Sequence, residues 1–277
     1  MLAKQAVLGF RVAMSSTAET RHRAILSLVR SQGFVSSDAL AAQLEVSVQT
    51  IRRDLDQLQE DRQLVRRHGG AGLDSSIENV SYADRKVLYG AEKVAIAELV
   101  ARHIPPRSSV FINIGTTTEA VARALAGHEG LRVITNNLHV AFSLSRTTDF
   151  EVNIAGGRVR NRDGGVIGPL TTEAIDTYRF DYGIIGISGI DEDGALLDFD
   201  PDEIRAARAI LRNARSVFLV ADHSKFTRRP MLRMGSIKEV TALFTDREPP
   251  KAIQAILSEH GVMLYLPAPP QKARKRA

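Results

Sequence analysis

Four short polar segments each follow an apolar run of the sequence, and their side chains suit a small charged ligand. The segments are residues 115–118, 135–137, 156–158 and 222–225. The first places a glycine and three threonines between an expected strand and an expected helix, where backbone N–H groups and hydroxyls meet at the positive end of the helix. Lys225 in the last segment adds a compact cation. Because ligands bind at the carboxyl ends of parallel strands, the four segments together predict a site for a phosphate-like anion.

Nine residues of these segments are candidates for binding the anion and the rest of its ligand. They are Gly115, Thr116, Thr117, Thr135, Asn136, Asn137, Gly156, Gly157 and Lys225. Each segment alone is also compatible with an ordinary turn that caps a helix, and Lys225 with a surface lysine. Arg158 fits either the site or its rim. The presence of all four segments favours a binding site.

A second group of side chains, near the N-terminus, suits contact with nucleic acid. Apolar residues recur at positions 48, 51, 55 and 58, which form one face of a helix, and Gln49, Thr50, Arg52 and Arg53 fall mainly outside that face. Glutamine matches adenine in the major groove, and arginine matches guanine or a phosphate. Ser47 precedes this helix and can hold a phosphate together with the N–H groups at the helix start.

Three more basic residues, Arg66, Arg67 and His68, lie on an expected strand and glycine-rich turn and can reach the flanking DNA backbone or the minor groove. The full set of candidate DNA-binding residues is Ser36, Ser47, Gln49, Thr50, Arg52, Arg53, Arg66, Arg67 and His68. The alternative interpretation is a small helical subdomain with solvated charges on its outer faces. Because both basic groups flank the same small unit, DNA binding is favoured.

The elements that carry this second group are three short helices followed by a hairpin. The helical pattern starts near residue 21, breaks at Gly33, resumes after residues 36–37, and resumes again after a tight turn at residues 45–46. Three helices with such a turn are the helix-turn-helix arrangement, and the hairpin makes it winged. We therefore expect a winged helix-turn-helix DNA-binding domain over residues 18–73, preceded by a disordered leader over residues 1–17.

Strand-like and helix-like patterns alternate after residue 91, and these elements must position the four polar segments. The apolar runs cover residues 110–114, 133–135, 152–155, 182–187, 216–221, 240–245 and 262–266. The helical patterns cover residues 91–103, 117–126, 138–145, 202–213 and 251–259. This alternation predicts a mostly parallel sheet covered by helices. We expect an α/β effector-binding domain over residues 91–266, a linker over residues 74–90, and a basic disordered tail over residues 267–277.

The composition excludes several classes of function. Cysteine is absent from the 277 residues, which excludes disulfides, Fe–S clusters, zinc fingers and thiol catalysis. The longest apolar runs fall short of the ~18 residues of a membrane span, so we expect a cytoplasmic protein without membrane contact. The net charge is +5, and the last seven residues carry four basic side chains and no acid, so charge alone is weak evidence for nucleic acid.

The acidic stretch at residues 198–203 has the spacing of a calcium loop, but the glycine and the distal glutamate of such a loop are missing. A helix start explains it better, with Asp200 as the cap, Pro201 at the first position, and Asp202 and Glu203 at the positive end. We therefore expect no metal. The seven histidines are scattered, and only His223 falls in a candidate segment, where a packing role is favoured.

Two motifs resemble the signature of the DeoR family of bacterial sugar-metabolism repressors. They are residues 46–55, Val-Ser-Val-Gln-Thr-Ile-Arg-Arg-Asp-Leu, and residues 67–71, Arg-His-Gly-Gly-Ala. The similarity continues from about residue 20 to residue 266. The resemblance implies that the helix after Ser47 is the recognition helix. It also implies an effector domain that is similar to ribose-phosphate isomerases and coenzyme A transferases and that binds phosphorylated sugars or related metabolites.

Residues 114–117, 135–136, 155–157 and 224–225 match the ligand-binding segments of this family. Residues 186–191, 196–200 and 222–226 are most similar to family members that respond to glycerol 3-phosphate. The resemblance therefore implies glycerol 3-phosphate as the effector, and no other cofactor. Two positions depart from the family. Asn113 stands where an aspartate is common, so a role for a carboxylate there is not carried over, and Pro201-Asp202 is expected to shift the local helix start.

We expect a non-enzymatic repressor of a carbohydrate or glycerol operon that is relieved by a phosphorylated effector. It should bind double-stranded operator DNA as a homo-oligomer, dimer or tetramer, because one recognition helix reads few base pairs. One alternative is a sugar-phosphate isomerase or acyl-CoA transferase that carries a DNA-binding module, with Asp222 and Lys225 as acid–base candidates but no second carboxylate in a matched segment. The other is a non-specific DNA binder that uses the basic tail.

Overall fold

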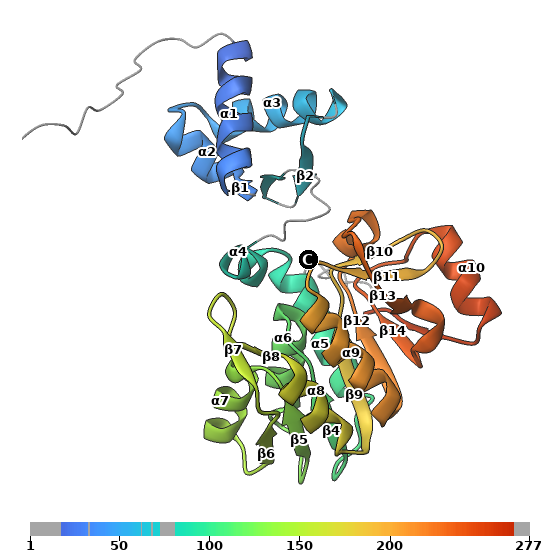
Figure 1. Cartoon of the computed structure of the whole chain (residues 1–277). Coiled ribbons are helices and arrows are strands. Elements are labelled where there is room, and N and C mark those ends of the chain that lie inside the picture. The colour runs from blue at the N-terminus through green and yellow to red at the C-terminus, as the bar shows by residue number, and fades with distance from the viewer. Residues whose placement is uncertain (1–17, 33, 62, 68, 73–80, 269–277) are drawn as a thin grey trace, which may run out of the picture. The chain divides into compact units, whose positions relative to one another are not determined.

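The protein has two compact units, residues 1–73 and residues 74–277, each with its own hydrophobic core (Figure 1). The structure, a computed structural model, describes residues 18–32, 34–61, 63–67, 69–72 and 81–268. The expected leader, His68, residues 74–80 of the expected linker and residues 269–277 of the expected tail lie outside these described residues.

The N-terminal unit is a winged helix-turn-helix, which confirms the expected fold. Its elements are α1 (Ala18–Gln32), β1 (Phe34–Ser36), α2 (Ser37–Gln43), α3 (Val48–Glu60), β2 (Val65–Arg67) and β3 (Gly70–Gly72), and the antiparallel strands have the order β1-β3-β2. Ile25, Leu40 and Ile51, one from each helix, are completely buried in its core. Strand β1 is not predicted from the sequence. It approaches β3 closely at Gly70, where a Cβ atom would lie 2.2 Å from the carbonyl oxygen of Val35.

A seven-stranded sheet, parallel at every pairing, forms the centre of the second unit. Its strands are β4 (Ser109–Ile112), β5 (Arg132–Thr135), β6 (Glu151–Ile154), β9 (Phe180–Gly186), β12 (Ala214–Val220), β14 (Ala242–Phe244) and β15 (Met263–Tyr265). Successive residues point to opposite faces of a strand, so Phe111 packs in the core on one face, and Val110 and Ile112 pack on the other. All seven strands coincide with apolar runs of the sequence, which confirms the α/β prediction.

Helices cover both faces of this sheet (Figure 1). On one face lie α5 (Gly90–Ala101), α6 (Thr116–Leu125) and α7 (Leu138–Thr147), and on the other lie α8 (Pro169–Asp176), α9 (Pro201–Asn213) and α10 (Lys251–Glu259). Two smaller antiparallel sheets flank them. One is the hairpin of β7 (Arg158–Arg160) and β8 (Gly165–Ile167), and the other joins β10 (Gly189–Ile190), β11 (Ala195–Asp198) and β13 (Leu232–Ser236). Short 3-10 helices η1 (His223–Thr227) and η2 (Ile237–Glu239) complete the unit.

The strand order is β15-β14-β12-β9-β4-β5-β6, and the side on which the chain adds new strands changes at β4. Strands β5 and β6 follow β4 on one side, whereas β9, β12, β14 and β15 continue on its other side. Ligands of open α/β sheets bind outside the carboxyl ends of the strands at such a reversal. The fold therefore places residues 113–118 at the centre of the candidate site, between the ends of β5 and β12.

The described part of the expected linker, residues 81–90, contains helical structure. The structure forms α4 (Tyr82–Val87) there, and α5 begins at Gly90. All six residues of α4 are at least partly exposed, so the helix shows no apolar periodicity for sequence analysis to detect. Helix α8 and the strands of the small sheets were also not predicted, because they are short. Within the described residues, no helix is long and apolar enough to cross a membrane.

Candidate functional site

Helix α3 presents the predicted recognition residues on its solvent side. Ser47 caps the helix, since its Oγ accepts a hydrogen bond of 3.1 Å from the N–H of Thr50. Gln49, Arg52 and Arg53 are exposed, while the opposite face of the helix is buried. Ser36 caps α2 in the same way, with 3.1 Å between its Oγ and the N–H of Ala39. The serines thus start the two helices of the motif, and Gln49, Arg52 and Arg53 are accessible to a partner.

A buried carboxylate that sequence reasoning missed fixes α3 against α1. Asp54 is only 5% exposed. Its Oδ1 accepts a hydrogen bond of 2.8 Å from Nη2 of Arg21 and lies 3.1 Å from Nε2 of His22. This carboxylate raises the pKa of Arg21 mainly through its hydrogen bond. The signal was present, because Asp54 follows Ile51 at helical spacing and interrupts the apolar face.

The basic residues of the wing have different surroundings. The guanidinium of Arg66 forms an ion pair with Asp56 of α3, and the Arg66 N–H donates a 2.9 Å hydrogen bond to Oε1 of Gln59. Arg66 therefore ties the wing to α3. Arg67 is the last residue of β2. His68 is outside the described residues.

At the end of β4, the turn into α6 is built as an N-terminal cradle. Gly115 caps α6 with a φ of 150°, a conformation that favours glycine. Thr118 closes the turn, because its Oγ1 lies 2.7 Å from the carbonyl oxygen of Asn113 and 2.8 Å from that of Gly115. Thr116 and Thr117 are buried in the first turn of α6. Asn113 bonds to the N–H of Ile114 at 2.8 Å, so the family's missing aspartate is replaced here by a local turn contact.

At the end of β5, most of the predicted polar atoms already have partners. The Thr135 hydroxyl donates to the Ile112 carbonyl at 2.6 Å. Asn137 caps α7 with its Oδ1 and donates from Nδ2 to Glu119 at 3.2 Å. Asn136 is different, because its buried Oδ1 has no hydrogen-bond partner among the described residues. Asn136 is therefore the residue of this segment with an acceptor available for a ligand.

The glycines after β6 allow close packing of α8. At Gly157 a Cβ atom would lie 2.1 Å from Oγ1 of Thr171, and the Thr171 hydroxyl donates to the carbonyl of Gly156 at 2.9 Å. The close approach of Thr171 explains the glycine at position 157, and the carbonyl of Gly156 serves as a backbone hydrogen-bond acceptor. Arg158, also in this segment, forms an exposed ion pair of 3.3 Å with Asp202.

After β12, a carboxylate and a lysine lie within one turn of η1. Asp222 is completely buried, and its Oδ1 accepts a hydrogen bond of 3.0 Å from the N–H of Ser224. Its Oδ2 has no hydrogen-bond partner in the described part of the chain. Burial lowers the pKa of Lys225 to about 7, although Asp222 opposes this shift. Burial raises the pKa of Asp222, but Lys225 and Ser224 outweigh it, so that pKa lies below its ordinary value.

His223 has a structural partner, as favoured from the sequence. Its Nδ1 lies 2.8 Å from Oδ2 of Asp246, and its ring meets that of Tyr89 edge-on at 4.9 Å. These contacts join η1 to the loop after β14 and to the start of α5.

Four further polar residues at this end of the sheet were missed from the sequence: Tyr82, Arg85, Lys93 and Glu119. Glu119 is buried and accepts hydrogen bonds of 2.9 and 3.0 Å from the hydroxyl of Tyr82. Glu119 is therefore a second carboxylate near the candidate site, in addition to Asp222, and it lies outside the matched sequence motifs. Lys93 is 5% exposed, and burial lowers its pKa to about 8. The sequence did contain a signal for this residue, because Lys93 shares the buried face of a helix with the apolar Ile96 and Ala97.

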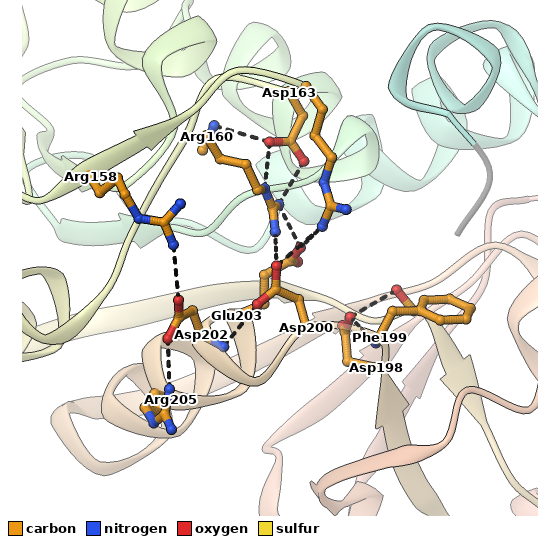
Figure 2. A network of polar contacts seen from close by, with 12 residues as sticks. Arg158, Arg160, Asp163, Asp198, Phe199, Asp200, Asp202, Glu203 and Arg205 are labelled. Carbon is orange, nitrogen blue, oxygen red and sulfur yellow. Dashed lines mark hydrogen bonds and ion pairs between the residues drawn. The ribbon is translucent and has the colours of Figure 1, made fainter. Parts of the chain in front are cut away.

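A network of arginines and acids borders these residues (Figure 2). Arg160 bonds to Asp163 at 2.6 and 2.9 Å and pairs with Asp200 and Glu203 at the start of α9. Asp163 also lies 3.6 Å from Arg85 of α4. Burial, reinforced by Glu203, raises the pKa of Asp198 to about 7. The network therefore joins the β7–β8 hairpin to both α9 and α4.

The acidic stretch at the start of α9 is the helix start expected from the sequence. Asp200 caps α9, since its Oδ1 accepts a 2.9 Å hydrogen bond from the N–H of Asp202, and Pro201 occupies the first helical position. Across the described residues, no group of three or more histidines and acids is arranged to hold a metal ion.

Comparisons with known proteins agree with these two units. Residues 21–77 match the DeoR-like helix-turn-helix domain, and residues 89–247 match the DeoR C terminal sensor domain. The chain is 51% identical over 246 residues to the glycerol-3-phosphate regulon repressor of Escherichia coli (strain K12), covering 89% of this chain and 98% of that protein. It is 42% identical over 251 residues to the HTH-type transcriptional repressor CsqR of the same organism, covering 91% of this chain and 96% of that protein.

Among solved structures, the ribose 5-phosphate isomerase A of Neisseria gonorrhoeae aligns with a TM-score of 0.36 and 14% identity, over 49% of this chain and 53% of that one. The two domain matches lie in order along the chain, and the sequence relatives align over almost their whole length. The chain therefore belongs to the DeoR family of helix-turn-helix transcriptional repressors.

Proposed function

We propose that this repressor controls a glycerol or related carbohydrate operon and that glycerol 3-phosphate releases it from its operator. The relatives named glycerol-3-phosphate regulon repressors, at 51% and 48% identity, support the regulon. The observation that carries the ligand is the presence, at the carboxyl ends of the strands, of two acceptor oxygens without partners among the described residues, on Asn136 and Asp222, together with the cation of Lys225. A polyol phosphate supplies the matching hydroxyl donors and anion.

In this proposal the phosphate binds Lys225 and the start of α6 at Gly115, Thr116 and Thr117. The polyol extends toward Asn136 at the end of β5. Strand β5 is the direct neighbour of β4 in the sheet, about 5 Å away, which the three-carbon part of the ester spans together with its hydrogen bonds. Thr135, Asn137, Gly156 and Gly157 then shape the site through the internal contacts described above.

The exposed residues of α3 bind the operator in the same proposal. Gln49, Arg52 and Arg53 read base edges or phosphates, while Ser36, Ser47, Thr50 and Arg66 support the docking surface. One recognition helix reads few base pairs, so we propose that two or four copies bind together. The effector lowers DNA affinity because it binds better to the arrangement that does not fit the operator.

The experiment that tests this proposal measures both ligands on one protein. Operator DNA is selected from a random pool, and its release is followed by fluorescence anisotropy while glycerol 3-phosphate is added. Lys225→Ala should abolish release but keep operator affinity, whereas Lys251→Ala, an exposed lysine on α10, should behave as wild type. An unchanged dose response of Lys225→Ala would remove Lys225 from the site. Turnover of glycerol 3-phosphate or ribose 5-phosphate would instead indicate an enzyme.

A further inference from the structure

Helix α4 is held in place by polar contacts. It begins at Ser81, directly after the segment that joins the two units, and all six of its residues are at least partly exposed. The Tyr82 ring stacks on His139 with 5.2 Å between centroids, and its hydroxyl donates to Glu119. Arg85 pairs with Asp163 at 3.6 Å. An element fixed by such contacts has little apolar burial to hold it, so changes in charge move it easily.

Lys93 provides the contact that closes the other end of α4. Its ammonium donates to the carbonyl of Arg85 and, at 2.6 Å, to that of Leu88, which are free acceptors at the C-terminal end of this helix. Between α4 and α5 the chain turns at Tyr89, a buried residue with a φ of 57°. The Lys93 side chain therefore holds the end of α4 across the turn at Tyr89. Few residues other than glycine adopt the backbone conformation of this turn.

The same buried ammonium interacts electrostatically with charged groups of the candidate effector site. Lys93 interacts electrostatically with Asp222, the carboxylate that also faces Lys225. Burial lowers the pKa of both lysines, to about 8 and about 7, and Asp222 opposes both shifts. The charged groups that act on either lysine are Asp222, Glu119, Glu92, Arg85 and Arg228, and the charge of Lys93 also lowers the pKa of Lys225. Two desolvated ammonium groups thus share the fully buried Asp222, and additional negative charge stabilises both.

We propose that Lys93 is a second effector-binding cation, which makes the site selective for phosphate monoester dianions and passes occupancy to α4. The inference rests on the proposed function. A dianion beside Lys225 competes with the carbonyls of Arg85 and Leu88 for the three N–H donors of Lys93. As the ammonium turns to the phosphate, α4 loses its C-terminal contact. The stability of α4, the first described element of the α/β unit, then changes with occupancy.

Calorimetry of the full-length protein at pH 8, in two buffers of different ionisation enthalpy, tests the binding step. Wild type should take up about 1.4 protons with glycerol 3-phosphate, because both lysines gain charge on binding. It should prefer this dianion over the methyl phosphodiester by about tenfold or more. Lys93→Gln should take up about half a proton less, lose about tenfold to a hundredfold in affinity, and discriminate by about threefold or less.

A second variant and a second measurement separate binding from helix capping. Lys93→Arg keeps a cation that does not titrate, so proton uptake should fall while the preference for the dianion persists. In anisotropy, Lys93→Gln should bind the operator more weakly without effector, and saturating effector should reduce that affinity by about half the wild-type factor or less. Proton uptake and the preference for the dianion depend on charge at position 93 in a way that a purely structural cap does not, whereas anisotropy reports the cap of α4 itself.

Two failures are distinguishable. If wild type does not bind glycerol 3-phosphate, the proposed function is wrong. If wild type binds it, and both Lys93 variants show wild-type affinity, proton uptake and discrimination, the proposed function stands and Lys93 is only the cap of α4. If Lys93→Gln does not fold, Lys93→Arg decides alone, and unchanged proton uptake in that variant overturns the inference.

Discussion

Asp54 in the DNA-binding unit and Asp222 in the α/β unit are both buried carboxylates, at 5% and 0% exposure, but their surroundings differ. Both oxygens of Asp54 are bonded, one to Arg21 and the other shared by Arg21 and His22. Asp222 uses one oxygen to cap η1, and its other oxygen has no partner among the described residues. A satisfied buried carboxylate supports a fold, whereas a half-satisfied one faces two lysines and is prepared for a ligand.

The difference extends to the units around them. In the DNA-binding unit the functional side chains are exposed on one helix, and the buried charge keeps that helix in position. In the α/β unit most of the candidate binding groups are themselves buried, and they come from α5, α6, the turn after β5, and the segment after β12 that forms η1. Substitution of the buried charge in the DNA-binding unit should therefore lower its stability. Substitution of the buried candidate groups in the α/β unit should instead lower ligand affinity.

The largest expected effect is on stability at Asp54. Asp54→Ala removes the carboxylate that Arg21 and His22 share, and breaking a buried ion pair costs about 3 kcal/mol. Urea unfolding followed by circular dichroism should show this loss in the transition of the N-terminal unit, together with weaker operator binding. Asp56→Ala is the matched control, because its exposed pair with Arg66 contributes about 1 kcal/mol or less. Equal losses for the two variants would remove the structural role assigned to Asp54.

The next largest effect is the pH dependence of effector affinity, which reflects Lys225. Its pKa of about 7 lies below the ordinary 10.5, so the unliganded protein loses this charge as the pH rises. Affinity for glycerol 3-phosphate should fall at least about 50-fold between pH 7 and pH 9. Calorimetry across this range measures it, and Lys225→Arg should remove most of the decrease. A flat profile for wild type would contradict the assignment of Lys225 to the anion.

The same shift has the opposite sign for stability. Between pH 7 and pH 10.5 the unfolded chain binds more protons at Lys225 than the folded chain does, so the unliganded α/β unit should become more stable as the pH rises through this window.

The two units also differ in how far sequence reasoning reaches. Helical periodicity separates the buried and exposed faces of α3, so Gln49, Arg52 and Arg53 could be identified as exposed from spacing alone. The parallel strands were predictable because each forms an apolar run. Helix α4 was not, because its contacts are polar and lie far away in sequence, such as Tyr82 with Glu119. Burial of a polar side chain depends on such distant partners.

In the effector site, the sequence could identify segments but not the state of each atom. Thr135, Asn136 and Asn137 are adjacent polar residues, yet two of them use their polar atoms in internal hydrogen bonds, whereas Oδ1 of Asn136 has no partner within the described part of the chain. Lys93 was missed because its neighbours in α5 are mostly apolar. Such a pattern predicts a helix of the hydrophobic core and not a ligand-binding side chain. Residue type and spacing locate such a site, and three-dimensional hydrogen bonding decides which atoms are available.

A smaller effect is expected for single exposed residues of α3. Arg52→Ala and Arg53→Ala should each weaken operator binding by about tenfold or more, and leave the unfolding midpoint unchanged. Anisotropy at several salt concentrations checks this, since loss of a phosphate contact also lowers the salt dependence. Gln57→Ala, exposed nearer the end of α3, is the control. Full operator affinity in the Arg52→Ala/Arg53→Ala double variant would exclude α3 as the DNA-reading element.

The smallest expected effect is at Tyr82, and it tests whether α4 connects the two kinds of site. Tyr82→Phe removes the hydroxyl that donates to Glu119 but keeps the ring on His139. A looser α4 should lower operator affinity without effector by about threefold and, because linkage is reciprocal, raise effector affinity by about the same factor. Calorimetry and anisotropy on the same preparation measure the two changes. If only one of the affinities changes, α4 does not couple the sites, because a shared equilibrium must move both.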